Sequence, residues 1–127
     1  MDIKSIVRIY KRRNLPKALA ELDYFRNLPT LELCINNAAL AINQKGKRYK
    51  HQTRFSKVTL STARSILLDN AKPFNEVKNF DELITLIDSL LKSVEGIGEL
   101  YIYDTSLRIG SYLGKYQFFS QIDLIDR

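Results

Sequence analysis

The amino-acid sequence is poor in the side chains that build disulfides and metal sites. Its 127 residues include one cysteine and one histidine. Cys34 has no partner for an internal disulfide, and apolar neighbours at helical spacing predict that it is a small buried hydrophobe. His51 has no cluster of Asp or Glu beside it, and the chain has no HExxH, CxxC or phosphate-loop glycine motif. We therefore expect no disulfide, no metal and no cofactor.

Long hydrophobic runs are missing as well. No segment approaches the roughly 18 consecutive apolar residues that a membrane-spanning helix needs. The amino terminus, MDIKSIVRIYKRR, is amphipathic and lacks the continuous apolar stretch of a signal peptide. Together with the single cysteine, these absences predict a cytoplasmic protein without a membrane partner.

The chain does contain enough apolar residues for one hydrophobic core. Hydrophobic residues make up 45% of the sequence, and this length suits one domain. Apolar residues recur at the helical period, and no alternating pattern indicates a sheet. The sequence thus predicts a single all-α domain over residues 1–127, a compact bundle of about six helices.

The helix boundaries follow from prolines, caps and the apolar period. Thr30 and Asp81 are expected as N-caps, and Gly46 is expected where the third helix ends. The apolar tail, residues 115–127, is expected to pack as a short helix or strand or to dock on a second subunit. The expected helices lie at about residues 3–15, 16–27, 31–42, 52–69, 81–94 and 99–114.

Charge is distributed unevenly along the chain. Residues 1–57 hold 13 Lys/Arg against 4 Asp/Glu, whereas residues 58–127 hold 7 against 10. Six cations fall between positions 45 and 57 without an acid, and Tyr49, His51 and Phe55 lie among them. Such a segment can neutralise phosphates while a ring stacks on a base. A solvated loop is the alternative. The candidate nucleic-acid-binding residues are Lys45, Lys47, Arg48, Lys50, His51, Arg54 and Lys57.

A glycine pair separates the last two expected helices. Gly96 and Gly98 flank Ile97, which indicates positive φ or a close approach of two helices. We expect Gly98→Val to harm folding for this reason. The GIG core with apolar helices on both sides resembles the helix-hairpin-helix family, at about residues 81–114. The resemblance implies that the hairpin around Gly96 and Gly98 offers backbone N–H groups to a DNA phosphate.

A second resemblance covers a larger part of the chain. The segments KHQTR, residues 50–54, and YDTSLRIGSYLG, residues 103–114, are similar to those of a set of small uncharacterised bacterial proteins. In that set an HQxR segment precedes a segment of the form GIG-x-L-x-x-YDT-x-RIG. This resemblance implies no activity.

The last expected helix carries a polar stripe. Asp104 and Arg108 stand four residues apart in the favoured order of acid before base. The stripe either meets another segment or lines a pocket, so the pair is a structural ion pair or a ligand-contacting or catalytic site. His51 is the other catalytic candidate. The remaining members of the stripe are Tyr101, Thr105, Ser111 and Tyr112.

Three functions are consistent with these patterns. The first is a nucleic-acid-binding or assembly module, for DNA or RNA, that uses the basic amino-terminal half. The second is a small enzyme or enzyme subunit with His51, Arg54, Asp104 and Arg108 around a shared pocket. The third is a protein-interaction subunit, or a homo-oligomer, that docks through residues 115–127.

Overall fold

The computed structural model describes residues 15–49 and 55–115. Within these residues the chain forms five α-helices and one 3-10 helix, with no strand beyond an isolated antiparallel bridge between Ile42 and Arg48. The predicted all-α class is confirmed. The helix expected at 3–15 falls mainly outside the described residues, as does the tail at 116–127. The elements are α2 (Leu15–Arg26), α3 (Leu31–Ala39), α4 (Lys57–Asp69), η2 (Lys72–Glu76), α5 (Phe80–Leu91) and α6 (Glu99–Leu113).

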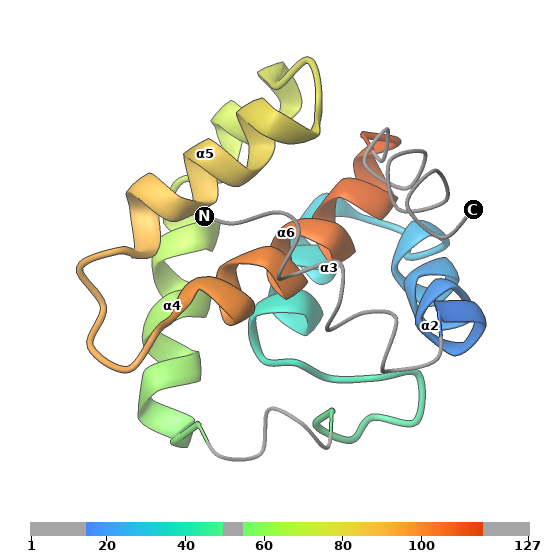
Figure 1. Cartoon of the computed structure of the whole chain (residues 1–127), viewed down its shortest axis with the longest axis horizontal. Coiled ribbons are helices and arrows are strands. Elements are labelled where there is room, and N and C mark those ends of the chain that lie inside the picture. Colours follow the sequence, from blue (N-terminus) through green and yellow to red (C-terminus); the bar gives the residue numbers. More distant parts are fainter. Residues whose placement is uncertain (1–14, 50–54, 116–127) are drawn as a thin grey trace.

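Helix α6 is the centre of the bundle. It packs against α2, α3 and α5, and α4 closes the bundle by packing against α3 and α5. Figure 1 shows α6 crossing the middle of the molecule. Every residue from Tyr101 to Ser111 is buried, so α6 has neighbours on all sides and its polar side chains need partners inside the protein.

Polar caps determine where α3 and α4 begin. Thr30 is the N-cap of α3, as predicted, and its hydroxyl accepts a hydrogen bond from the Leu33 N–H at 3.1 Å. Ser56 caps α4 in the same way, with 3.0 Å to the Thr59 N–H. Helix α4 therefore begins at Lys57, later than the expected start near residue 52, and Phe55 precedes it.

The N-cap of α5 is Asn79, so the prediction of Asp81 was wrong. The Asn79 side chain accepts a hydrogen bond from the Glu82 N–H at 2.9 Å, and the helix begins at the buried Phe80. Asp81 lies in the first turn, where a carboxylate is favoured by the helix dipole. The sequence signal was ambiguous because Asn and Asp are equally good caps.

Helix α3 ends earlier than expected. It stops at Ala39, and Ala41 adopts a positive φ of 57°. The Ile42 N–H then bonds to the Asn37 carbonyl at 2.9 Å, which turns the chain out of the helix. Gly46, with φ of 74°, belongs to the following turn and does not end the helix. Helix α5 similarly stops at Leu91, short of the predicted Val94.

The two glycines of the hairpin between α5 and α6 differ in conformation. Gly96 has a φ of +91°, which L-residues rarely adopt, and a Cβ there would lie 3.6 Å from the Thr59 side chain of α4. Gly98 is the N-cap of α6 with a φ of −114°, which any residue adopts, and open space surrounds its Cβ position. The expectation of positive φ at Gly98 was therefore wrong, and the constraint lies at Gly96.

We predict that Gly96→Thr destabilises the protein by about 1–3 kcal/mol, because a β-branched residue at this φ is strained. Gly98→Thr is the matched control, since threonine is about as good an N-cap as glycine. Urea denaturation of both variants measures the difference. Equal midpoints for the two variants would show that Gly96 is not constrained.

Candidate nucleic-acid interface

A short turn after α3 presents the first lysines of the basic run. We call residues 43–47 the basic turn. Its ends are joined by the Asn43 N–H bonding to the Lys47 carbonyl at 2.7 Å, and the Asn43 side chain accepts from the Lys45 and Lys47 N–H groups at 2.9 and 3.1 Å. Gly46 supplies the positive φ that this turn requires. The turn is therefore held by its own hydrogen bonds, and the Lys45 and Lys47 residues are exposed on it.

The basic turn leads back toward the start of α4 through Arg48. This half-buried residue donates a hydrogen bond from Nη1 to the Phe55 carbonyl at 2.8 Å. Lys57, the first residue of α4, is exposed. In the sequence no aspartate or glutamate stands between Glu32 and Asp69. The carboxylates nearest in sequence therefore lie well outside this basic segment.

A hollow lies between the end of α3, the basic turn and the first turns of α4. Its volume is about 240 Å³. The described residues in its walls are two cations, one hydroxyl and three aliphatic side chains, so it offers both positive charge and apolar contact. We call it the cationic hollow. Its lining residues are Leu40, Ile42, Arg48, Lys57, Leu60 and Ser61.

The outer face of α4 continues this surface with small polar side chains. The helix has no acid in its first turn, so its positive dipole end is not neutralised by a neighbouring carboxylate of that turn. Val58 is 76% exposed beside Lys57, which leaves an apolar side chain on a polar face. A shallow groove of about 460 Å³ follows the helix, lined by Lys57, Val58, Ser61, Thr62, Ser65, Ile66 and Asp69.

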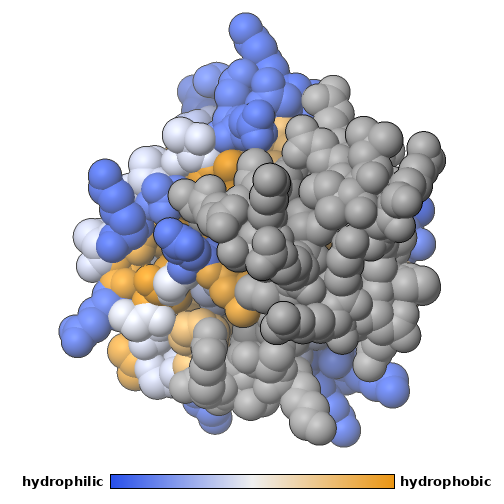
Figure 2. Space-filling model, in the orientation of Figure 1, coloured by the Kyte–Doolittle hydropathy of each residue, from blue (hydrophilic) through white to orange (hydrophobic). Residues whose placement is uncertain are grey.

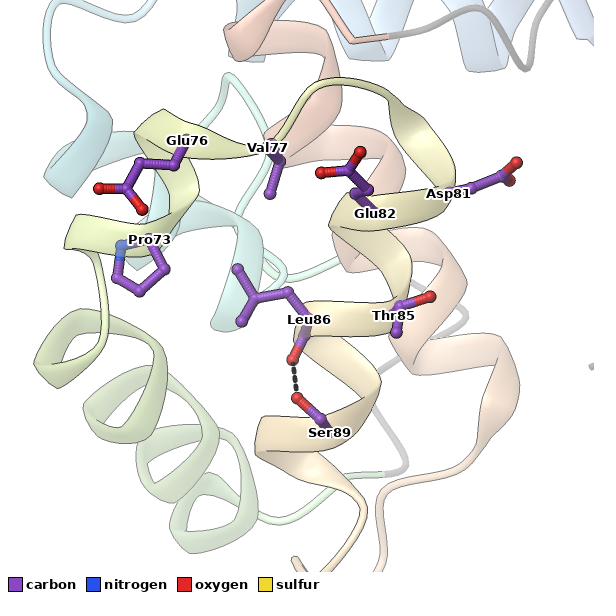
Figure 3. Close-up of a pocket in the computed structure, with 8 residues that line it drawn as sticks. All are labelled: Pro73, Glu76, Val77, Asp81, Glu82, Thr85, Leu86 and Ser89. Atoms are coloured by element: carbon purple, nitrogen blue, oxygen red, sulfur yellow. Dashed lines mark hydrogen bonds between the residues drawn. The ribbon is translucent and has the colours of Figure 1, made fainter.

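The opposite end of the molecule is acidic. A groove of about 550 Å³ lies between η2 and α5, and the described residues that line it include three carboxylates and no cation. Figure 3 shows Pro73 and Leu86 facing each other across it. In Figure 1 this corner lies at the top, whereas the basic turn and the start of α4 lie along the bottom. The lining residues are Pro73, Glu76, Val77, Asp81, Glu82, Thr85, Leu86 and Ser89.

The space-filling view shows one face of the molecule coloured by hydropathy. Hydrophilic side chains lie at its upper, left and lower margins, around a smaller area of apolar and intermediate residues (Figure 2).

The polar stripe of α6 meets neighbouring helices. Arg108, 4% exposed, donates to the Ala38 carbonyl at 3.2 Å, and Tyr101 donates to the Ala39 carbonyl. Both carbonyls belong to the last turn of α3, and that of Ala38 also accepts from the Ala41 N–H at 3.2 Å. Ser111 donates to the Leu22 carbonyl of α2 at 2.9 Å. Of the two expected alternatives, these contacts follow the first, in which the stripe meets another segment.

The Arg108 guanidinium also lies against aromatic rings. Its Cζ is 4.5 Å from the Tyr49 ring centroid and 5.9 Å from that of Phe25 in α2. The two rings are stacked with centroids 6.3 Å apart. A desolvated cation over aromatic faces is strongly attracted to them. Arg108 thus connects α6 with α3, with α2 and with the segment after the basic turn.

Burial raises the pKa of several weak acids around α6. Desolvation raises the pKa of Cys34 and that of Tyr101 each to about 12. For Tyr49, desolvation also raises the pKa to about 12, against an opposing effect of the Arg108 charge. Burial and, secondarily, the Asp104 charge raise the pKa of Tyr103. Cys34 is fully buried, as predicted, so its thiol is not a nucleophile near neutral pH.

The structure brings together part of the predicted site. Arg48 and Lys57 line one hollow, and Lys45 and Lys47 stand on the adjoining turn. Three predicted residues, Lys50, His51 and Arg54, lie outside the described residues. The predicted grouping of His51 and Arg54 with Asp104 and Arg108 stays a prediction for the same reason.

Two predicted features lie away from the cationic hollow. Asp104 is 1% exposed, and neither it nor Arg108 lines any of the three hollows described above. At the hairpin, Gly96 stands against α4 at Thr59, and it follows the exposed Glu95. Sequence reasoning missed the walls of the cationic hollow, Leu40, Ile42, Leu60 and Ser61, since apolar residues at helical spacing indicate core and carry no sign of a cavity.

Comparison of the chain with protein-family models, with curated proteins and with solved structures gives no match. The two resemblances stated above therefore stay predictions. Among residues 15–49 and 55–115, no three or more His, Cys, Asp or Glu side chains are grouped so as to hold a metal. No helix in this part of the chain has the length and apolar character to cross a bilayer.

We predict a loss of stability at alkaline pH. Burial raises the pKa of Cys34, Tyr49 and Tyr101 to about 12 in the folded protein, from ordinary pKa values of 9.0 for the thiol and 10.0 for the phenols. Their contribution to the free energy of unfolding is complete below about pH 9. It is lost as pH rises toward 12, at up to about 1.4 kcal/mol per pH unit for each group. Urea denaturation at about pH 8 and about pH 11 measures this loss. Tyr101→Phe should reduce it, and an unchanged free energy of unfolding would contradict the burial of these groups.

We predict that Arg108→Lys destabilises the protein by about 1–3 kcal/mol, because an ammonium does not reproduce the planar contact with Tyr49 together with the bond to Ala38. Arg26→Lys is the control. Arg26 forms an exposed ion pair with Asp23 at 2.6 Å, and such pairs contribute about 0–1 kcal/mol. Thermal melting compares the two variants. Equal losses would show that Arg108 does not hold the helices together.

Proposed function

We propose that this protein is a non-enzymatic nucleic-acid-binding module whose contact surface is the basic turn together with the start of α4. One observation carries the proposal. Exposed Lys45 and Lys47 stand on a hydrogen-bonded turn beside a hollow that is lined by Arg48 and Lys57. Lys50, His51 and Arg54 continue the same basic run in the sequence.

The defined backbone of the basic turn favours a role in binding over a role in solubility alone. A solvated loop needs no defined backbone, whereas four hydrogen bonds that involve the backbone and side chain of Asn43 hold this turn. A preformed turn loses less conformational entropy when its lysines contact a phosphate. The positive end of the α4 dipole lies close to Lys57 and adds to the same potential.

Phosphate is the group that this surface suits best. Ammonium groups on flexible stems contact phosphate as point charges, and the described part of the surface has no element shaped to enter a DNA groove and read bases. The proposed binding is therefore independent of sequence and weakened by salt. The acidic groove at the other end of the molecule would repel a polyanion and leaves the basic end as the contact face.

The hairpin is assigned a packing role in this proposal. Gly96 takes its positive φ against Thr59 of α4, which explains the glycine without a ligand. Glu95 and Glu99 are both exposed next to it, and carboxylates there would repel a phosphate. The hairpin thus supports the interface by holding α4 in place.

The test is reversal of charge on the basic turn. Lys45→Glu/Lys47→Glu should weaken binding of a fluorescent DNA or RNA oligonucleotide and flatten the slope of log affinity against log salt by about 2, if both lysines contact phosphate. The matched control is Lys72→Glu/Lys78→Glu, which makes the same change in net charge at two exposed lysines near the acidic groove. Fluorescence anisotropy at several salt concentrations measures both variants.

The two variants separate a local site from a general charge effect. The Lys72→Glu/Lys78→Glu control should keep most of the slope of log affinity against log salt, because it changes the net charge and leaves the basic turn as it is. No binding by the wild-type protein at micromolar concentration and low salt would end the proposal. Equal losses in the two variants would assign the binding to net charge alone.

A further inference from the structure

We propose that the cationic hollow receives one unpaired base, so that the protein prefers single-stranded nucleic acid over duplex. This inference rests on the proposed function and names the form of nucleic acid that the same surface takes. It is drawn from the walls of the hollow, which combine cations with an apolar surface that a phosphate alone does not need.

The size of the hollow suits one base. Pockets for drug-sized ligands measure roughly 300–1,000 Å³, and the cationic hollow is smaller, at about 240 Å³. It has room for a single ring system. A base that is paired and stacked inside a duplex does not enter such a hollow, whereas a base in a single strand is free to turn into it.

The chemistry of the walls matches a nucleotide. Leu40, Ile42 and Leu60 provide apolar contact for the faces of a base. The Ser61 hydroxyl is both a donor and an acceptor for polar atoms on its edge. Among the described residues that line the hollow there is no aromatic ring, and the planar group that these residues offer for stacking is the guanidinium of Arg48.

The cations are placed for the phosphate of the same nucleotide. The bond from Arg48 Nη1 to the Phe55 carbonyl fixes the guanidinium at the wall, so its orientation is set before a ligand arrives. Lys57 lines the same hollow and is exposed to solvent. From a phosphate bound there, the nucleic-acid strand would continue toward Lys45 and Lys47 of the basic turn. Binding of the base thus adds to the phosphate contacts of the proposed function and does not replace them.

The experiment compares three ligands of equal length with the full chain. These are a single-stranded oligonucleotide, a duplex, and a strand in which every residue is abasic and only the phosphates and sugars remain. We expect the single strand to bind about tenfold more tightly than the other two, which is the effect of one base contact. The abasic strand separates the base contact from charge and needs no change in the protein.

Filling the hollow is the second arm. Ser61 is exposed and lines the hollow, so Ser61→Phe should remove the tenfold preference while duplex binding and its salt slope stay as in wild type. Ser65→Phe places the same ring one helical turn further along α4, outside the hollow, and should behave like wild type. Melting temperatures show whether both variants fold.

The outcomes separate the two proposals. Binding without preference among the three ligands overturns the base site and leaves the proposed function standing, as does a preference that survives in folded Ser61→Phe. Absence of binding to every ligand overturns both. Should Ser61→Phe fail to fold, the abasic strand alone decides, because its affinity either falls to that of the duplex or equals that of the single strand.

Discussion

The buried guanidinium of Arg108 is the interaction on which the arrangement of the helices depends. It lies over the Tyr49 ring at 4.5 Å and donates to the Ala38 carbonyl at the end of α3, with Phe25 of α2 close by. A cation at a helix C-terminus also meets the negative end of the dipole. One side chain of the central helix thereby joins two other helices and the segment that follows the basic turn. A buried charge is costly unless it is satisfied in this way.

The same contact links the core to the candidate interface. Tyr49 directly follows Arg48, and its N–H bonds to the Ala41 carbonyl, so the ring held by Arg108 fixes the backbone that returns from the basic turn. Arg48 donates a hydrogen bond to the Phe55 carbonyl, and the Phe55 ring packs edge-on against Tyr101 of α6. The exposed lysines are thus presented by backbone that is anchored in the core.

Much of the fold was predictable, since periodicity reports burial directly. The Thr30 cap and the burial of Cys34 followed from local sequence. The cap at Asn79 and the positive φ at Gly96 did not follow from local sequence. In each case a second candidate, Asp81 or Gly98, stood two residues away, and packing decided between the two. The cationic hollow was beyond sequence reasoning, because its aliphatic walls come from two separate segments, residues 40–42 and Leu60, that only the tertiary fold brings together.

The acidic groove and the basic turn place groups of opposite charge on separate parts of the molecule. A polyanion turns such a molecule before contact, so that productive collisions become more frequent than random orientation allows. Under the proposed function, the same separation would decide which side chains a bound copy turns away from the strand. Each bound copy would direct the carboxylates of Glu76, Asp81 and Glu82 toward solvent. A further polyanion would be repelled by these carboxylates.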